Sequence, residues 1–503
     1  MGQVIFGRRV LESATIDERS RRAMSGLAML GLEEGDSVAL LLRNDIAFLE
    51  ASLAISALGA YSVPINWHAR PAEIEAVLAD SGAKLVIAHA DLASAIDARH
   101  RVLVVRTPRE IIEAYALDRE ACRVPASALE WDPCLESQAC WSSAPRRPRG
   151  SIVYTSGTTG TPKGIQREPS AGATDERSFE QTVHVNFGIR PGLRSLVCGP
   201  LYHSMQTANM RAAYSALGPD GMLVIEPRFD PERLLATIEL HRVTHILMVP
   251  IMFYRLLRLG EDVRRRYSLR SLEFVVHSAA PCPIEVKRGM IEWFGPVIHE
   301  FYAQSELGAV TLISSEESLR KPGSVGRALP GCTVKVLDAS GNEAPAGERG
   351  EIAAVNRSYP DFTYRNCPEA RRALERGGLV ATGDVGYIDK DGYLFLCGRN
   401  NDRVISGGVN IFPVEIEELL GACPGVADCA VFGIPDEEYG EVLAAHIQPE
   451  AGSDLSEPAV RAWLHERLPG FKLPKVIRLE ASLPREESGK IFKRRIRERY
   501  PAS

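Results

Sequence analysis

Short apolar runs alternate with amphipathic stretches along the first two thirds of the chain. Residues 37–42 form an apolar run typical of a buried strand, and residues 47–58 have the periodicity of a helix. The same alternation returns at 62–88 and again at 231–250 and 283–299. Strands that alternate with helices predict parallel sheets whose faces the helices cover.

The pattern changes after about residue 330. Residues 333–337, 350–355 and 392–396 are strand-like segments separated by glycine- and aspartate-rich turns, which is typical of antiparallel strands. Residues 119–149 are rich in Arg, Pro and Ser, and we interpret them as a connector. After the polar run 399–403, about a hundred residues have a helix and strand pattern of their own, long enough for a small domain.

These patterns predict an α/β fold with two domains. The large N-terminal domain, residues 1–398, is expected to contain parallel-rich sheets with helices and a small antiparallel, barrel-like part. Residues 399–403 are the expected hinge, and residues 404–503 the expected small, mobile α+β C-terminal domain.

Composition narrows the class of protein. A chain of 503 residues is too long for one compact core. Its hydrophobic fraction of 45%, charged fraction of 25% and net charge of −6 give no reason to expect nucleic-acid binding. No run approaches the roughly 20 apolar residues of a membrane span, no secretory signal core is present, and the ten cysteines form no C-x-x-C pair. We expect a cytoplasmic protein without integral membrane association.

The loop Tyr154-Thr-Ser-Gly-Thr-Thr-Gly-Thr-Pro-Lys-Gly164 carries the strongest chemical signal. Small residues let backbone N–H groups approach an anion, and hydroxyls with an ammonium group add donors, so the loop is suited to a polyphosphate. It is not a P-loop of the common kind, because Pro162 stands where that motif needs glycine and Gly164 follows Lys163. The candidate phosphate-binding residues are Thr155, Ser156, Gly157, Thr158, Thr159, Gly160 and Lys163.

Five further motifs follow in order. They are Pro200-Leu-Tyr-His-Ser204, His299-Glu-Phe-Tyr-Ala-Gln-Ser-Glu306, Thr382-Gly-Asp-Val-Gly-Tyr387, the stretch 398–417, and Leu483-Pro-Arg-Glu-Glu-Ser-Gly-Lys490. With the phosphate loop they span nearly the whole chain. In this order and spacing the chain resembles the adenylate-forming superfamily, which includes acyl-CoA synthetases, peptide-synthetase adenylation domains and luciferases, and most closely its AMP-forming acyl-CoA ligases.

The resemblance implies that ATP activates a carboxylic acid as acyl-AMP and that CoA then accepts the acyl group. It implies Lys490, Glu306 and His203 as catalytic residues, with Glu306 as the Mg²⁺ ligand and Lys490 between the substrate carboxylate and the α-phosphate. Tyr302 would present a face to adenine, while Asp384 and Arg399 would bind the ribose. The remaining implied nucleotide-binding residues are Ser278, Ala279, Ala280 and Ser305.

The second half-reaction is also implied by the resemblance. Rotation of the C-terminal domain would withdraw Lys490 and bring Gly407 and Gly408 to the tunnel for the CoA thiol, where glycines permit close backbone approach. Lys472 is a further candidate for the CoA phosphates. The hinge position is Asn401, where the family usually has Asp or Lys, and this departure leaves the rate of rotation open.

The acyl substrate is predicted from fewer residues. No acidic residue lies near Leu201-Tyr-His-Ser204 to bind an ammonium group, so an α-amino acid is not expected. Small residues at 278–280 leave room for a medium- or long-chain or ring-bearing acid. Ala303 and Ser305 replace the usual Gly and Thr of the family's motif. The candidate acyl-pocket residues are His203, His277, Ala280, Ala303 and Gly308.

Two alternatives stay open at this point. A stand-alone adenylating enzyme would load the thiol of a carrier protein, whereas a nucleotide-binding regulator would have lost catalysis. Retention of Glu306, Asp384, Arg399 and Lys490 argues against the second. The expected partners are therefore a small-molecule carboxylic acid, ATP and CoA, with a carrier protein and a homodimer left open.

Overall fold

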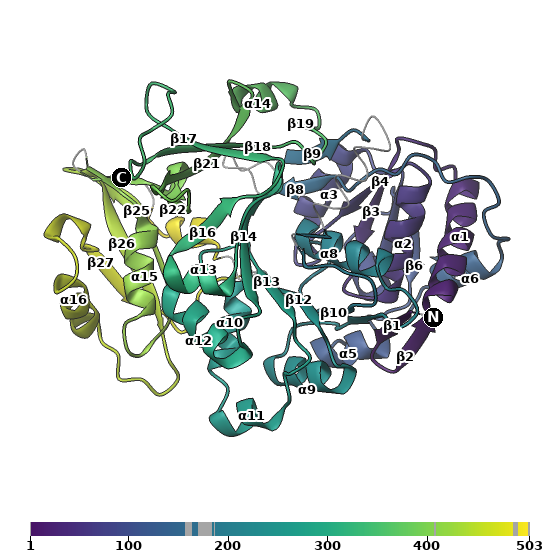
Figure 1. Ribbon diagram of the computed structural model, residues 1–503. Helices are drawn as coiled ribbons and strands as arrows, with labels where there is room; N and C mark the ends of the chain where they lie inside the picture. The colour runs from purple at the N-terminus through teal and green to yellow at the C-terminus, as the bar shows by residue number, and fades with distance from the viewer. Residues whose placement is uncertain are drawn as a thin grey trace.

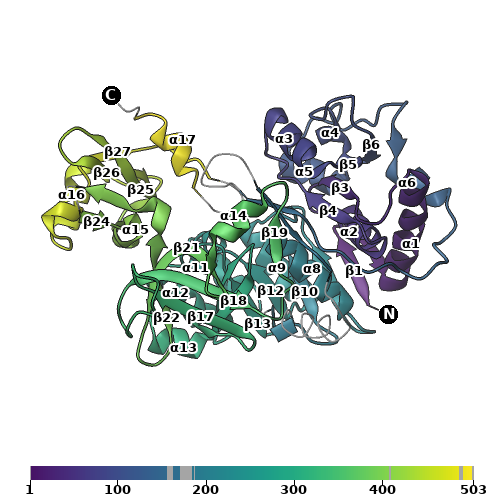
Figure 2. The ribbon, with the colours of Figure 1, turned by 90° about the horizontal axis from the view of Figure 1, so that it is seen from above.

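The computed structural model describes residues 2–155, 163–169, 184–185, 187–406, 409–485 and 491–500. Side chains of Thr155, Asn401, Asn410 and Arg494 are outside the description. Figure 1 shows two layered sheets with helices on the right and centre, and a smaller unit on the left that holds the C-terminal residues. The N-terminal and C-terminal parts lie at opposite ends of the molecule in both Figures 1 and 2.

A five-stranded parallel sheet forms the N-terminal end of the fold. Its strand order is β4-β3-β5-β6-β7, and every neighbouring pair is parallel, as the alternating pattern predicts. The strands are β3 (Ser37–Leu41), β4 (Tyr61–Pro64), β5 (Leu85–His89), β6 (Val102–Val105) and β7 (Leu129–Glu130), and the helices are α1 (Ser13–Met29), α2 (Ile46–Ala57), α3 (Pro71–Ser81), α4 (Ala90–Ala93), α5 (Arg109–Tyr115) and α6 (Trp131–Glu136).

The expected connector 119–149 contributes more than a link. It contains β7 and α6, and the Trp131 side chain is 1% exposed with its indole N–H donating to Glu50 Oε2 at 3.1 Å. The interpretation as a connector is therefore wrong for this part. Burial of a tryptophan whose N–H finds a partner anchors the segment under the first sheet.

The largest sheet joins the parallel and antiparallel parts. Its parallel part has the strand order β1-β11-β10-β12-β13-β14. From β14 through β15 and β16 onward, neighbouring strands are antiparallel. Its strands are β1 (Gln3–Phe6), β2 (Arg9–Glu12), β10 (Arg194–Val197), β11 (Met222–Ile225), β12 (His245–Met248), β13 (Phe274–His277), β14 (Ile298–Gln304), β15 (Gly308–Ile313), β16 (Ser324–Ala328), β17 (Cys332–Leu337), β18 (Gly350–Asn356), β20 (Glu375–Arg376), β21 (Leu379–Ile388) and β22 (Leu394–Arg399).

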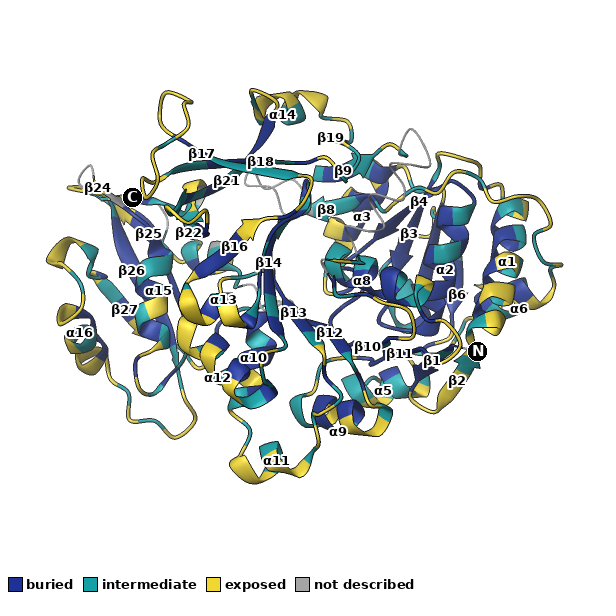
Figure 3. Ribbon diagram, viewed as in Figure 1, coloured by how far each residue is buried: buried dark blue, intermediate teal, exposed yellow. Residues whose placement is uncertain are grey.

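Helices cover the parallel part of this sheet. In Figure 3 its strands are coloured as buried, while the helices turn yellow, exposed residues outward. Buried apolar side chains of β10–β14, α9, α10 and α12 form one core, which places a rigid platform beneath the strand ends. The helices are α8 (Ser204–Ser215), α9 (Pro231–His241), α10 (Pro250–Leu257), α11 (Glu261–Arg266), α12 (Ile284–Phe294), α13 (Ser315–Arg320) and α14 (Pro368–Ala373).

A three-stranded antiparallel sheet lies between the two large sheets. Its order is β19-β9-β8, formed by β8 (Val153–Thr155), β9 (Lys163–Arg167) and β19 (Phe362–Tyr364). β8 and β9 flank the predicted phosphate loop. The sheet therefore brings residues 362–364 beside β9, which follows that loop, although about 200 residues separate β9 and β19 in the sequence.

The C-terminal segment has its own mixed sheet and core. Strands β23 (Val404–Ser406), β24 (Val409–Ile411), β25 (Val426–Asp436), β26 (Gly440–Pro449) and β27 (Val476–Leu479) pair with helices α15 (Pro413–Gly421), α16 (Glu457–His465) and α17 (Lys493–Arg497) against them. Two short 3₁₀ helices, η1 (Asn400–Asp402) and η2 (Gly470–Lys472), complete it. The α/β class with a large unit and a small α+β unit is as predicted.

Candidate active site

The predicted site residues gather at the carboxyl ends of parallel strands. β10, β12, β13 and β14 run in the same direction, so the segments that follow them emerge at one edge of the sheet. His203 follows β10, Ser278 follows β13, and Tyr302 lies near the carboxyl end of β14. Open α/β sheets bind their ligands at this edge.

Asp384 is the centre of a polar cluster beside Tyr302. The Tyr302 hydroxyl donates to Asp384 Oδ2 at 2.5 Å, and the Gln304 amide donates to the same oxygen at 2.9 Å. Arg399, which faces Asp384 across the β21–β22 pair, places its Nε 3.4 Å from Oδ1. Two residues assigned to the ribose and one assigned to adenine are therefore brought together.

Burial decides the protonation of this cluster. Burial, with the neighbouring Asp384 carboxylate, raises the pKa of Tyr302 well above 10, so its hydroxyl keeps the proton that it donates. Asp384 is itself 8% exposed and has three donors around it. A carboxylate has about four acceptor positions, so one of these donors must yield if a sugar diol is to engage both oxygens.

The β14–β15 pair contains a bulge opposite Tyr302 and Ala303, and its extra residue is Val310 of β15. Such a bulge bends the strand that carries the extra residue and increases the local twist. Gly308 closes the turn with a φ of +69°, and a β-carbon there would lie 2.7 Å from the Tyr359 ring. Backbone conformation and packing thus both require this glycine. Its assignment to the acyl pocket, like that of Ala303, stays a prediction.

Glu306 follows β14 and faces the phosphate-loop sheet. Its Oε1 accepts a hydrogen bond of 2.9 Å from the Tyr364 hydroxyl on β19. The Lys163 ammonium at the start of β9 lies 5.5 Å from the centre of the Tyr364 ring. The predicted metal carboxylate and the predicted phosphate lysine are therefore close neighbours of one aromatic ring.

Glu306 is a single carboxylate, and such a site suits Mg²⁺ better than it suits a metal ion whose ligands all come from protein side chains. Among the described residues, no group of three or more His, Cys, Asp or Glu side chains could hold a metal ion. Mg²⁺ is usually bound by one or two carboxylates together with substrate phosphates and water. Glu306, beside Lys163, fits that donor set.

The segment after β13 has an unusual backbone. Ala279 has a φ of +78°, in the left-handed region that residues other than glycine adopt rarely. Ser278 is buried, Ala279 exposed and Ala280 half-buried. Strain of this kind is characteristic of ligand-binding loops.

A buried ion pair lies beneath that segment. Lys287 of α12 and Glu300 of β14 are 7% and 5% exposed and contact each other directly. His277, fully buried, places its Nε2 4.0 Å from Glu300 and packs edge-on against Phe253. Burial and the Lys287 charge lower the pKa of His277 well below 6.5, so the imidazole is neutral. His277 lies under the loop, and its acyl-pocket role stays a prediction.

His203 lies in an aromatic corner. It is the residue before α8, and its ring centre is 4.3 Å from that of Tyr202. Tyr202 in turn meets Trp67 edge-on at 6.2 Å, and Arg43 stacks over Trp67. The neighbourhood is therefore aromatic and includes the Arg43 cation, and the role of His203 stays a prediction.

The C-terminal unit touches the larger unit through charged contacts. Glu415 of α15 accepts from Arg349 of the β17–β18 turn at 3.0 Å and also contacts Lys472. Arg258 donates to the carbonyl of Ala427 at 3.0 Å. Lys472 is thus engaged by a carboxylate, and a CoA phosphate would have to compete with Glu415 for it.

Several predicted residues lie outside the described part of the chain. Ser156, Gly157, Thr158, Thr159, Gly160, Gly407, Gly408 and Lys490 belong to this group, and the Thr155 and Asn401 side chains are not described either. Their assignments stay predictions from the sequence. Ser305, which is described, offers its backbone carbonyl to Arg167.

Four residues of this neighbourhood were not singled out from the sequence. Gln304 lies inside a motif that drew attention to its neighbours instead. The partners of Arg167, Lys287 and Tyr364 are 13 or more positions away along the chain, so no local spacing reports them. Gln304 could have been predicted from the sequence, because residues two positions apart in a strand lie on the same face, which places its amide on the face of Tyr302.

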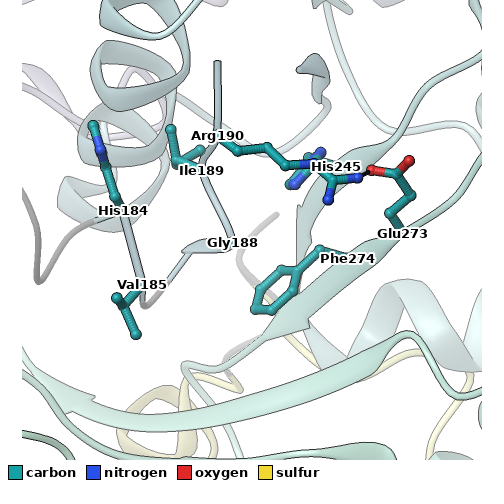
Figure 4. A pocket seen from close by; sticks show the side chains of 8 residues that line it. All are labelled: His184, Val185, Gly188, Ile189, Arg190, His245, Glu273 and Phe274. Atoms are coloured by element: carbon teal, nitrogen blue, oxygen red, sulfur yellow. Dashed lines mark ion pairs between the residues drawn. The ribbon is translucent and has the colours of Figure 1, made fainter. Parts of the chain in front are cut away.

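A separate hollow among the described residues lies away from the Asp384 cluster. A cavity of about 350 Å³ is lined by residues that include Phe274, His245 and the Arg190–Glu273 ion pair, and Figure 4 shows these side chains. His245 and Phe274 begin β12 and β13, so the hollow is at the amino ends of the strands. Burial lowers the pKa of His245 to about 4. This hollow is on the opposite edge of the sheet from the Asp384 cluster.

Comparison with known proteins identifies the family of the chain. The AMP-binding enzyme family matches residues 4–357, and the AMP-binding enzyme C-terminal domain matches residues 415–490. A feruloyl-CoA synthase from an Amycolatopsis species is 32% identical over 99% of this chain and 95% of its own. A long-chain-fatty-acid–CoA ligase of Mycobacterium tuberculosis is 32% identical over 97% of this chain and 93% of its own.

A solved structure gives the same architecture. The o-succinylbenzoate CoA synthetase of Bacillus subtilis, in complex with its acyl-adenylate intermediate, superposes with a TM-score of 0.78 at 25% identity, covering 98% of this chain and 94% of that one. The fold and site define an adenylate-forming enzyme. The chain belongs to the AMP-binding enzyme family, and it is an AMP-forming acid–CoA ligase. None of its described helices has the length and apolar character needed to span a membrane.

Proposed function

We propose that this ligase activates a medium- or long-chain or ring-bearing carboxylic acid at the strand ends described above. The convergence of Tyr302, Gln304 and Arg399 on Asp384 carries the proposal, because it would supply a nucleotide site, and the small residues 278–280 follow β13, the strand that pairs with β14. One relative is named for feruloyl-CoA and another for long-chain fatty acids. Both names support a roomy acyl pocket.

ATP and the acid are both anionic, so the first half-reaction needs positive charge at the phosphates. Lys163 and the hydroxyls of the 155–160 loop would hold the leaving pyrophosphate, and Lys490 would bridge the attacking carboxylate and the α-phosphate. Asp384 and Arg399 would fix the ribose. Glu306 would hold Mg²⁺, which supplies further positive charge to the phosphates when bound.

The second half-reaction would use the same site after the domains rearrange. The boundary is proposed at 399–403, with residues 1–398 and 404–503 on either side. Gly407 and Gly408 would then line the thiol path. Lys472 would leave its contact with Glu415 and bind a phosphate of CoA instead. A cytoplasmic location is proposed from the sequence. Whether the enzyme is a monomer or a homodimer is left open.

Pyrophosphate release across a panel of acids tests this function. The panel contains acetate, straight-chain acids of increasing length and aromatic acids, each assayed with CoA, with a carrier-protein thiol and with neither. We expect turnover with CoA and a large acid. Turnover with the carrier protein alone would favour the carrier-loading alternative, and acid-independent nucleotide binding without pyrophosphate release would favour a regulator.

Filling the pocket wall is expected to exclude large acids selectively. Ala280→Trp should lower kcat/KM for long-chain or ring-bearing acids roughly ten- to a hundredfold, because overpacking costs about 1–3 kcal/mol for a ligand that occupies the space. Acetate-sized acids, which never reach that space, serve as the internal control. A wild type that prefers acetate or propionate would contradict the large pocket while leaving adenylation intact.

A further inference from the structure

Glu306 is held from two sides by residues that belong to the phosphate-loop sheet. β9 begins at Lys163 and ends at Arg167, and its neighbour β19 ends at Tyr364. Arg167 binds the backbone of the Glu306 turn, and Tyr364 binds the Glu306 side chain. We refer to Arg167 and Tyr364 as the Glu306 bracket.

Arg167 fixes the turn through its main chain. Its guanidinium donates to the carbonyls of Ser305 and Glu306 at 2.8 and 2.5 Å. It also lies 5.9 and 6.0 Å from the ring centres of Tyr359 and Phe362. Burial lowers the pKa of Arg167, so placing a cation here has a cost that the carbonyls and rings offset. An interior arginine on two adjacent carbonyls sets the direction of the residue between them.

Tyr364 fixes the carboxylate itself. Its hydroxyl donates to Oε1 at 2.9 Å, and burial together with the adjacent carboxylate raises the pKa of the phenol, so the proton stays on tyrosine. With Oε1 engaged, the carboxylate plane is restrained and Oε2 has a defined direction. Groups that orient a metal ligand in this way change metal affinity about 10- to 100-fold when they are removed.

We propose that Arg167 and Tyr364 are positioning residues that hold Glu306 ready for the divalent cation of the ATP complex and tie it to Lys163. The proposal rests on the proposed role of Glu306. It follows from geometry: β9 carries Lys163 at one end and Arg167 at the other, while Tyr364 touches both Lys163 and Glu306. The phosphate lysine and the metal carboxylate therefore share one support.

The test measures divalent-cation dependence in the full-length enzyme. In Tyr364→Phe, the concentration of Mg²⁺ that half-saturates adenylation should rise about 10-fold, while kcat at saturating Mg²⁺ changes much less. Arg167→Met should raise it about 10- to 100-fold, and Arg167→Lys, which keeps the charge and one donor, should recover part of the loss. Mn²⁺ affinity, measured by electron paramagnetic resonance with α,β-methylene-ATP, should weaken in parallel without any turnover.

Two matched variants separate positioning from general packing. Tyr393→Phe removes a comparable tyrosine–glutamate hydrogen bond, 3.1 Å to Glu317, away from the site. Arg194→Met removes an arginine that donates to the His241 carbonyl at 2.6 Å. Neither should change the Mg²⁺ requirement, and thermal melting of all variants reports folding separately.

The outcomes distinguish this proposal from the function on which it rests. An unchanged Mg²⁺ requirement in Tyr364→Phe and Arg167→Met, or an equal change in the two matched variants, would overturn the bracket while leaving Glu306 as the metal ligand. If Glu306→Gln itself left Mg²⁺ and Mn²⁺ dependence unchanged, the metal role of Glu306 would be wrong and the bracket with it.

Discussion

Replacing Lys490 by alanine is expected to lower the rate of adenylate formation by about two to four orders of magnitude. The reaction brings a carboxylate to a phosphate that is already anionic, and loss of one well-placed positive group typically costs this much. Thioester formation from pre-made acyl-adenylate should change by no more than about threefold, because the carboxylate–phosphorus bond that Lys490 would assist has by then been formed. Single-turnover assays of the two half-reactions measure both rates.

Lys493 supplies the matched control. It lies three positions further on, and its ammonium group pairs with Glu417 at 2.8 Å, so it is a nearby lysine with a different partner. Lys493→Ala should leave both half-reactions within about threefold of the wild type. Equal losses in both half-reactions of Lys490→Ala, or no loss in either, would contradict the assigned role.

The order of strands and helices could be predicted because local patterns report it. β3 and α2 lie within one residue of their predicted bounds, and α9 and β12 fall within the alternating stretch 231–250. Pairing partners could not be predicted in the same way. β16 joins β15 to β22 and so merges the parallel and antiparallel parts into one sheet, which depends on contacts far apart in the chain.

The candidate site was predictable where chemistry and spacing coincide. Tyr302, Glu306, Asp384 and Arg399 were identified because each lies in a motif whose residue types suit nucleotide chemistry. The supports of these residues were not identified. Tyr364 looks like an ordinary strand aromatic, and Arg167 like a strand-end cation, until the β9–β19 pairing brings both to Glu306.

The same limit explains the segment 119–149. Its composition favours a loop, yet one tryptophan decides its structure. Trp131 reaches Glu50, 81 positions earlier, and that carboxylate also binds Arg19. Burial of a large side chain with its polar atom satisfied outweighs the local preference for irregular structure.

Asp384→Asn is expected to reduce kcat/KM for ATP roughly 10- to 150-fold. Hydrogen bonds to a charged acceptor contribute about 1.5–3 kcal/mol, and an amide offers the ribose one acceptor oxygen in place of two. The fold should persist, since asparagine has the shape of aspartate and its oxygen can still accept a hydrogen bond from Tyr302. Asp389→Asn is the control. Asp389 lies five positions after Asp384 and pairs with Lys321 at 2.7 Å instead.

A sugar analogue shows whether this loss arises at the ribose. The wild type should prefer ATP to 2′-deoxy-ATP about 100-fold, because the analogue leaves an acceptor of Asp384 unpaired. Asp384→Asn, having already lost that interaction, should discriminate only a few-fold. If the variant kept the wild-type ratio while its turnover fell, Asp384 would act by holding Tyr302 and Gln304 in place rather than by binding the sugar, and the ribose would have to be recognised by other residues. The preference for ATP over 2′-deoxy-ATP, rather than the turnover rate, therefore shows whether Asp384 binds the ribose or only holds Tyr302 and Gln304 in place.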